Sequence, residues 1–394
     1  MGAVLRLPGV LPLFVANCVA RLPMGALGLL LILQTHEVSG SFARGGLVAG
    51  AYTLSVGLSN PALARLVDRT GQTLVMRLGA VVAATAMVGF ALLPADAPFG
   101  ALLACAMVAG AAQPPVGACM RALWPVLAPD ADMRHAALSL EGIALEVIYI
   151  CGPVAIVGGI GTWSLTAGLV FCAAAVLVGD LAFSLHPASR AWRPVPHLER
   201  HLAGALRGRG VIVLVAVFAL CGLAIGATEV AVPATLEPLG RDGLTGPLLG
   251  LWGVGSLLGG FASARAGAAL DPPHRLALLL VLWGAAHAAL AFGTEPVSLG
   301  ALLLIAGIAI APTIVVANGM LDALAPAGTL TEAFTWTTAG LTSGIAAGAA
   351  LAGAIVESSS PSLAFALLGG GGVLAAVLVR ASAAGPLRES AAPA

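Results

Sequence analysis

The chain has 394 residues, of which 59% are hydrophobic and only 9% are charged, and its formal net charge is zero. Soluble domains carry charges on about a quarter of their residues, so we expect this chain to lie in a lipid bilayer. All 18 basic residues are arginine, and the equal number of acidic residues predicts no surface for nucleic acid. The six cysteines lie singly in apolar stretches, so neither a metal site nor another cofactor is expected.

A helix needs about 20 apolar residues to cross a bilayer. Divided at its charges, prolines and glycine clusters, the sequence predicts helices over residues 10–34, 43–65, 73–94, 98–125, 135–160, 163–185, 211–236, 244–266, 275–293, 297–321, 331–356 and 362–380. With the N-terminus inside, fifteen arginines fall in inner loops or helix ends, and only Arg44 and Arg241 fall outside. Positive residues favour the cytoplasmic side, so we expect a multi-pass protein of the inner membrane with both termini in the cytoplasm.

The longest polar stretch lies in the middle of the chain. Residues 186–210 carry five arginines and three histidines, and they separate residues 1–185 from residues 211–394. The spacing from Phe14 to Gly25 equals that from Phe218 to Glu229, which favours an internal repeat. The sequence therefore predicts an all-α membrane protein with twelve transmembrane helices in two six-helix bundles joined by a cytoplasmic linker, and we expect a monomer.

The loop after the second predicted helix carries a short motif. Residues 64–73 read A-R-L-V-D-R-T-G-Q-T. This run resembles the loop signature of the major facilitator superfamily, G-x-x-x-D-R-x-G-R-R/K, although the first glycine and the final basic pair are replaced. The resemblance implies that Asp68, Arg69 and Gly71 belong to an inner gate, with Arg121 as a partner of Asp68. The alternative is a positively charged turn that the aspartate caps.

The fifth predicted helix contains Gly152 and Pro153, followed by Gly158 and Gly159. This pattern resembles the Gly-Pro signature of drug–proton antiporters in the same superfamily, in which the second glycine pair is closer to the proline. Glycine and proline let helices approach and bend, so the alternative is an ordinary kink. The arginine-only composition and the run at residues 21–25 resemble actinobacterial members of the superfamily.

Four charged residues are expected inside the membrane, where each costs about 3 kcal/mol. They are Arg21 in the first helix, Glu141 and Glu146 in the fifth, and Glu229 in the seventh. In the superfamily fold, helices one, four, seven and ten line a central cavity, flanked by helices two, five, eight and eleven. The resemblance therefore implies that these residues belong to a substrate and proton pathway. A buried ion pair that joins helices one and five is the structural alternative. Asp180, near the inner end of helix six, is expected to reach water.

Depth along the predicted helices assigns partners to these charges. Arg21 and Glu146 lie equally deep, so we expect them to pair. Glu229 then lacks a basic partner in the membrane, which makes it the expected proton carrier. The amides Asn17, Gln113 and Asn318 lie in helices one, four and ten and are expected to add substrate contacts.

Small apolar residues otherwise fill these helices, which suits an apolar or amphipathic solute. No nucleotide-binding loop and no catalytic arrangement occurs in the sequence, so we do not expect an enzyme. The sequence predicts a secondary carrier that exports a small amphipathic molecule by alternating access, with protons as the coupling ion. Uptake of a metabolite with the same fold is one alternative, and a membrane sensor or scaffold that transports nothing is another.

Overall fold

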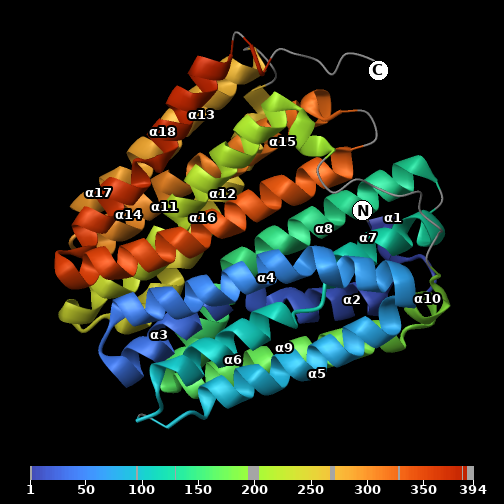
Figure 1. Ribbon diagram of the computed structural model, residues 1–394, viewed down its shortest axis with the longest axis horizontal. Coiled ribbons are helices and arrows are strands. Elements are labelled where there is room, and N and C mark those ends of the chain that lie inside the picture. Colours follow the sequence, from blue (N-terminus) through green and yellow to red (C-terminus); the bar gives the residue numbers. More distant parts are fainter. Residues whose placement is uncertain are drawn as a thin grey trace.

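The computed structural model of the protein describes residues 2–94, 96–128, 130–193, 204–266, 271–326, 329–383 and 385–387. Across these ranges the backbone consists of helices and short connections, and no strand occurs within them (Figure 1). This confirms an all-α fold.

The helices of the first part of the chain are α1 Gly2–Leu5, α2 Val10–Arg21, η1 Leu22–Gly25, α3 Leu27–Ser39, α4 Phe42–Thr70, α5 Gln72–Ala91, α6 Phe99–Ala111, α7 Val116–Leu127, α8 Ala131–Gly152, η2 Pro153–Gly161, α9 Leu165–Leu185 and α10 Pro187–Ala191. Those of the second part are η3 Ala205–Arg207, α11 Arg209–Leu236, η4 Glu237–Leu239, η5 Asp242–Leu244, α12 Thr245–Ala266, α13 Pro272–Ala289, η6 Leu290–Phe292, α14 Pro296–Ile308, α15 Ile310–Leu324, α16 Leu330–Ser358, α17 Pro361–Gly369 and α18 Gly371–Ser382.

Eleven helical segments of the described chain are long and apolar enough to cross a membrane, so this is a multi-pass membrane protein. They coincide with eleven of the twelve predicted spans. The other predicted span is α4, whose 29 residues extend about 43 Å. Its middle is rich in glycine, serine and threonine, and it packs against α3, α6 and α16. A helix covered by protein on several sides needs fewer apolar residues, so α4 remains the predicted twelfth span.

Several spans are interrupted near their middle. The first changes from α2 to the 3₁₀ turn η1 and then to α3, and the fourth breaks between α6 and α7 at Gln113, Pro114 and Pro115. Proline lacks an N–H group and cannot continue the helical hydrogen bonds. Within a membrane such backbone is tolerated only where protein or a water-filled cavity surrounds it. The interruptions therefore mark the interior of the bundle.

Buried apolar side chains form three clusters. One lies within residues 4–183 and surrounds the junction of α4 and α5, and another lies within residues 205–387 and surrounds the junction of α15 and α16. The third joins residues 26–176 to residues 227–365. We call the end of the bundle where α3 ends and α4 begins the latch end, and the opposite end, where α9 ends, the linker end. The two parts of the chain thus share one core at the latch end and have separate cores at the linker end.

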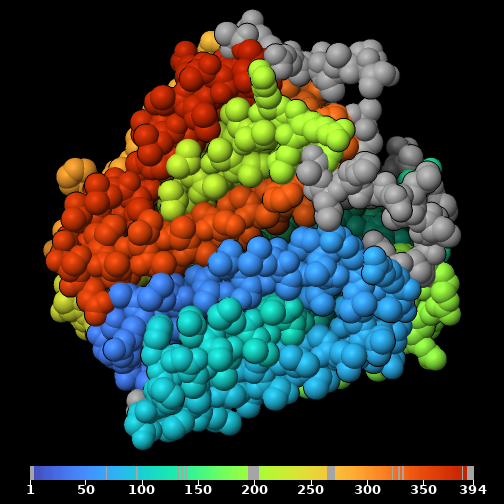
Figure 2. All heavy atoms as spheres, in the orientation of Figure 1, coloured from blue at the N-terminus to red at the C-terminus, as the bar shows by residue number. Residues whose placement is uncertain are grey.

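Close helix contacts hold the two parts together toward the latch end. Helices α4 and α16 lie side by side, and the early and late parts of the chain meet along them (Figures 1 and 2). A methyl group at Gly50 would lie 2.7 Å from the carbonyl oxygen of Ala346, and one at Gly353 would lie 2.7 Å from Cα of Ala43. A second contact joins η2 to α12, where a methyl group at Gly158 would lie 2.6 Å from Cδ of Pro247. Only glycine permits such close packing of helices.

Candidate functional site in the helix interior

Arg21 occupies the point where the first span is interrupted. It is the last residue of α2, and Pro23 in η1 prevents the α-helix from continuing. The residue is only 8% exposed. Its guanidinium carbon lies 3.3 Å from the place that a Cβ atom at Gly117 would occupy, in the first turn of α7. A bulkier residue there would displace the guanidinium, so Gly117 provides the space that Arg21 fills.

The carboxylate beside Arg21 belongs to Glu141, so the predicted pairing of Arg21 with Glu146 is wrong. Glu141 is 5% exposed and interacts electrostatically with Arg21 and with Arg121, whereas Glu146 shows no interaction with Arg21. The indole of Trp124 lies beside the same carboxylate. Neither Glu141 Oε1 nor Trp124 Nε1 makes a hydrogen bond of standard geometry to a described group.

The error came from the start of the fifth helix. Counted from residue 135, Glu146 lies as deep as Arg21 does in its own helix. Helix α8 begins at Ala131 instead, so Glu141 lies ten residues, about 15 Å, into it. Arg21 lies eleven residues, about 16 Å, into α2. Glu141 therefore matches the depth of Arg21, and Glu146 lies about one and a half turns further.

Glu229 lies in α11 and is partly buried. Its Oε2 lies 3.6 Å from the place of a Cβ atom at Gly28 in α3, so the carboxylate faces the other part of the chain. Its interacting neighbour is Tyr149 of α8, which also interacts with Arg21 and Glu146. Within the described ranges Glu229 has no basic partner. Tyr149 thus lies near charged residues of both parts of the chain.

The three predicted amides are not gathered at one place. Asn17 is 1% exposed, one turn before Arg21 on the same helix, and its Oδ1 has no partner in the described part of the chain. Gln113 lies in the break between α6 and α7, and its Oε1 is likewise buried without a described partner. Asn318 lies in α15 and is partly buried. Asn17 thus precedes Arg21 by one turn and Gln113 lies four residues before Gly117, whereas Asn318 belongs to the late part of the chain.

The motif loop forms the tight turn between α4 and α5. Gly71 has φ of +89°, a conformation that side chains disfavour, which explains this motif glycine. Arg69 is exposed, and the side chain of Asp68 lies outside the described residues. Arg121, its predicted partner, is exposed and interacts with Glu141 and Arg21. The gate role of this group stays a prediction.

Gln72 replaces a basic residue of the loop motif. Its side chain is 1% exposed and makes hydrogen bonds at the linker end. Its Nε2 donates to the carbonyl oxygen of Cys119 in α7 at 3.0 Å, and its Oε1 accepts from Ser189 Oγ in α10 at 3.0 Å. An amide can donate and accept at once, which an arginine cannot do. The replacement therefore connects α5, α7 and α10.

The predicted hinge in helix five is a change of helix type. Gly152 ends α8, and Pro153 begins η2, a nine-residue π-helical segment. Gly152 packs against Gly25 of η1, and Gly158 packs against Pro247 of α12. Gly159 is exposed and touches only its own helix. Three of the four residues thus serve close packing between helices.

Two polar contacts at the latch end join the early and late parts of the chain, and sequence reasoning missed both. His36 Nε2, at the end of α3, lies 2.8 Å from Glu237 Oε1 in η4, and the His36 ring stacks on Phe42 at 3.8 Å. Ser41 Oγ donates to Glu357 Oε2 of α16 at 3.1 Å. We call these two contacts the polar latch. All four residues lie just beyond the ends of predicted spans, so the search for charges inside the membrane does not include them.

The expectation that Asp180 of α9 reaches water is wrong. Its side chain is 0% exposed, and neither carboxylate oxygen has a hydrogen-bond partner in the described ranges.

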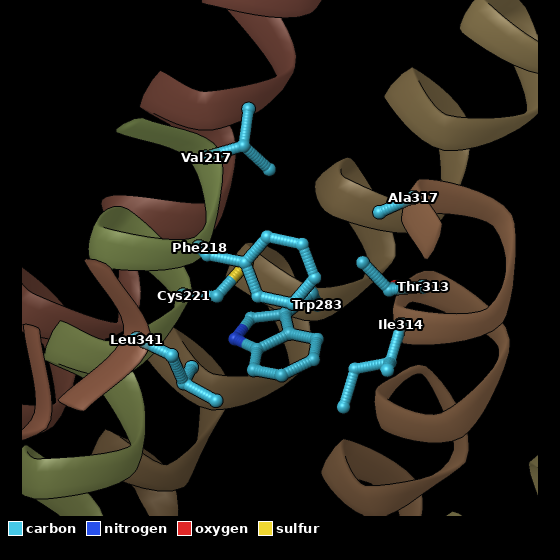
Figure 3. Close-up of a pocket in the computed structure, with 8 residues that line it drawn as sticks. All are labelled: Val217, Phe218, Cys221, Trp283, Thr313, Ile314, Ala317 and Leu341. Atoms are coloured by element: carbon cyan, nitrogen blue, oxygen red, sulfur yellow. The ribbon is translucent and has the colours of Figure 1, made fainter. Parts of the chain in front are cut away.

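A small pocket between α11, α13, α15 and α16 is lined by Trp283, Phe218 and other apolar side chains (Figure 3). The hydroxyl of Thr313 in its wall donates to the carbonyl oxygen of Ala309. The pocket therefore offers little polar recognition.

Interrupted spans, charges held inside the bundle and a core shared at one end are features of a polytopic membrane protein with polar groups in its interior. Residues 13–280 match the Major Facilitator Superfamily, which is about two thirds of the chain. The chain belongs to this superfamily, and it is a membrane transporter. The family resemblance of the motif loop is thereby confirmed.

Solved structures agree on the fold. The nucleoside transporter NupG aligns with a TM-score of 0.77 at 13% identity, over 94% of this chain and 98% of that one. A peptide transporter, POT in complex with sulfate, aligns with a TM-score of 0.75 at 14% identity, over 98% and 96% of the two chains. No curated protein matches the sequence significantly. At such low identity the likeness extends to the fold and not to the substrate.

Proposed function

We propose that the protein is a secondary active carrier that exports a small amphipathic molecule by alternating access, with protons as the coupling ion. Its twelve spans, α4 included, form two six-helix bundles over residues 1–185 and 211–394, joined by the linker 186–210. The protein works as a monomer in the inner membrane with both termini in the cytoplasm.

The uneven distribution of the core supports alternating access. The two parts share an apolar cluster at the latch end, where glycines bring α4 onto α16 and η2 onto α12. Toward the linker end each part has its own cluster. Two bodies that pack tightly at one end and separately at the other are arranged to rock about a site between them. By the arginine distribution the closed end faces the outside.

The observation that carries proton coupling is the position of Glu229. Its carboxylate points from the late part of the chain toward Gly28 of the early part and has no basic partner in the described ranges. A charged carboxylate is costly in such surroundings, so exchange of a proton is the low-cost way to move it through a transport cycle. Tyr149 lies near both Glu229 and Arg21 and is the residue that we expect to relate the proton step to the Arg21 region.

Replacement of Glu229 by glutamine tests the coupling. Glu229→Gln mimics the protonated state, so we expect it to abolish accumulation driven by an imposed pH gradient in proteoliposomes while substrate exchange persists. The exposed Glu37→Gln in the last turn of α3 is the matched control and is expected to transport like the parent. If Glu229→Gln still concentrates substrate, the proton role moves to Glu146 or Glu141, or coupling must be abandoned.

The same assay distinguishes the remaining alternatives. If the protein exports its substrate in exchange for protons, substrate should accumulate in the more acidic compartment. If it takes up substrate together with protons, substrate should accumulate in the less acidic compartment. A sensor or scaffold would move no solute under either gradient. The partial Gly-Pro pattern at Gly152 and Pro153 is the feature that favours export.

A further inference from the structure

The guanidinium of Arg21 is buried, and its N–H donors have no hydrogen-bond acceptor among the described residues. Arg21 is 8% exposed, and it makes no ion pair and no hydrogen bond with another described residue. Arginine carries five N–H donors and stays charged in proteins. A cation this deep in a membrane protein is costly unless oxygen atoms accept those donors.

The backbone beside Arg21 also favours negative charge. Helix α7 starts inside the fourth span, after Pro114 and Pro115, and its first turn has no side-chain cap. The N–H groups of Ala118 and Cys119 bond to the carbonyl of Pro115, whereas that of Gly117 makes no backbone hydrogen bond to a described group. The start of a helix carries partial positive charge, and in transporters such half-helix ends point at anionic substrate groups. Arg21 lies directly against this turn.

One carboxylate accompanies the buried guanidinium among the described side chains, and it belongs to Glu141. Arg121 lies one turn beyond Gly117 and also interacts with Arg21, but its side chain is exposed, and the side chain of its predicted partner Asp68 lies outside the described residues. Arg21 is therefore the buried cation of this region whose N–H donors lack a described acceptor.

We propose that the molecule carried by this protein is an amphipathic anion, with a carboxylate group that binds Arg21 at the start of α7 and an apolar body that lies along the alanine-, glycine- and leucine-rich helices. This inference rests on the proposed transport function and names its substrate class. A carboxylate accepts two parallel hydrogen bonds from one guanidinium, which satisfies the donors of Arg21 that have no described acceptor.

A matched set of probes tests the charge that the site recognises. Hexanoate, hexylamine and hexanol share one apolar body, and each is titrated into purified protein in phosphatidylcholine nanodiscs while the melting temperature is followed. We expect hexanoate to stabilise the protein and the other two to have little effect. Equal or greater stabilisation by hexylamine or hexanol overturns the proposal. So does loss of the hexanoate effect in phosphatidylglycerol nanodiscs, since the site would then bind a lipid headgroup.

Variants connect the probe to Arg21. Arg21→Gln is expected to weaken hexanoate binding about tenfold or more, because a charge-assisted hydrogen-bonded pair is lost. Gly117→Ala places a methyl group against the guanidinium and is expected to weaken binding in a protein that still folds. Gly142→Ala in α8, where a methyl group meets nothing within 4 Å, is the control and should bind like the parent. Unchanged hexanoate binding in both Arg21→Gln and Gly117→Ala overturns the proposal.

Glu141 separates recognition from a purely structural role. Glu141→Gln removes the carboxylate that competes with the ligand, so it is expected to tighten hexanoate binding severalfold. Unchanged or weaker hexanoate binding in Glu141→Gln would indicate a purely structural pair and counts against the proposal. These measurements are made at equilibrium without a proton gradient. They can therefore fail while proton-driven transport stands, and the Glu229 test can fail while anion binding stands.

Discussion

At the scale of single residues, the interaction of the buried Arg21 with Glu141 joins α2 to α8. A charged residue within an apolar stretch is conspicuous in a sequence, so the sequence predicts that Arg21, Glu141 and Glu229 lie inside the membrane. Their partners depend on the starting points of two helices and on how those helices tilt. A shift of four residues at the start of α8 was enough to exchange Glu141 for Glu146. Depth along a helix is thus a weak guide to partners.

The corrected pairing predicts different stabilities for two similar variants. Glu141→Gln removes the carboxylate next to Arg21 and is expected to destabilise the ligand-free protein by about 1 to 3 kcal/mol, since it strands a buried cation. Glu146→Gln should have a much smaller effect, because Glu146 does not interact with Arg21. Melting curves of the purified variants measure the difference. A larger loss for Glu146→Gln would restore the pairing that depth alone suggested.

At the scale of helices, glycine positions decide which elements meet. Helix α4 approaches α16 through Gly46, Gly50 and Gly57, which lie on one face of the helix. In the sequence these glycines only lowered the hydropathy of the span. In the fold they let two helices of different halves touch backbone to backbone. This contact is the one that must break if the latch end opens.

A methyl group at this contact should therefore favour the opened state. Gly46→Ala places Cβ against the carbonyl oxygen of Ala349, and overpacking of this kind costs about 1 to 3 kcal/mol. Because 1.4 kcal/mol changes a population tenfold, we expect the distance distribution between spin labels at Glu37 and Ser358 to show an additional population at longer distance. Gly100→Ala in α6 meets nothing within 4 Å and serves as the control for added helix propensity. An unchanged distance distribution for Gly46→Ala would show that the contact is not the closure.

At the scale of the whole molecule, the latch end combines packing with a few polar contacts. The polar latch joins His36 to Glu237 and Ser41 to Glu357, residues more than 200 positions apart in sequence. Both contacts lie at the rim of the shared core. Packed apolar surface excludes water from a large area, whereas a partly exposed polar pair adds little energy. The shared core should therefore hold this end closed, and the polar latch should fix how the helices of the two parts align along each other.

The energy of the latch can be compared directly with that of the helix contact. The Glu237 side chain is 49% exposed, so its pair with His36 is worth about 1 kcal/mol or less. Glu237→Gln should then increase the opened population no more than about fivefold, which is less than Gly46→Ala. The same pair of spin labels reads out both variants. A larger effect from Glu237→Gln would mean that charge, not packing, holds the two parts together.

The orientation of the molecule gives a separate prediction. Arginine asymmetry places the linker, including position 197, in the cytoplasm, and places Arg241 outside. In a cysteine-free background, a cysteine at position 241 should react with an impermeant reagent in intact cells, and one at position 197 should react only after the cells are opened. Reaction at position 197 from outside would reverse the topology and with it the face to which the latch end belongs.

Local sequence patterns are enough to predict a helical membrane protein, the place of most spans and the charges within them. The bilayer demands long apolar stretches and makes each interior charge stand out, so these properties can be read locally. The packing of the helices is needed to see that Arg21 lies near Glu141 and against Gly117, that Gln72 links three helices, and that the two parts share a core at one end. Such contacts join residues far apart in the chain, and they depend on helix starts, breaks and tilts that no local pattern records.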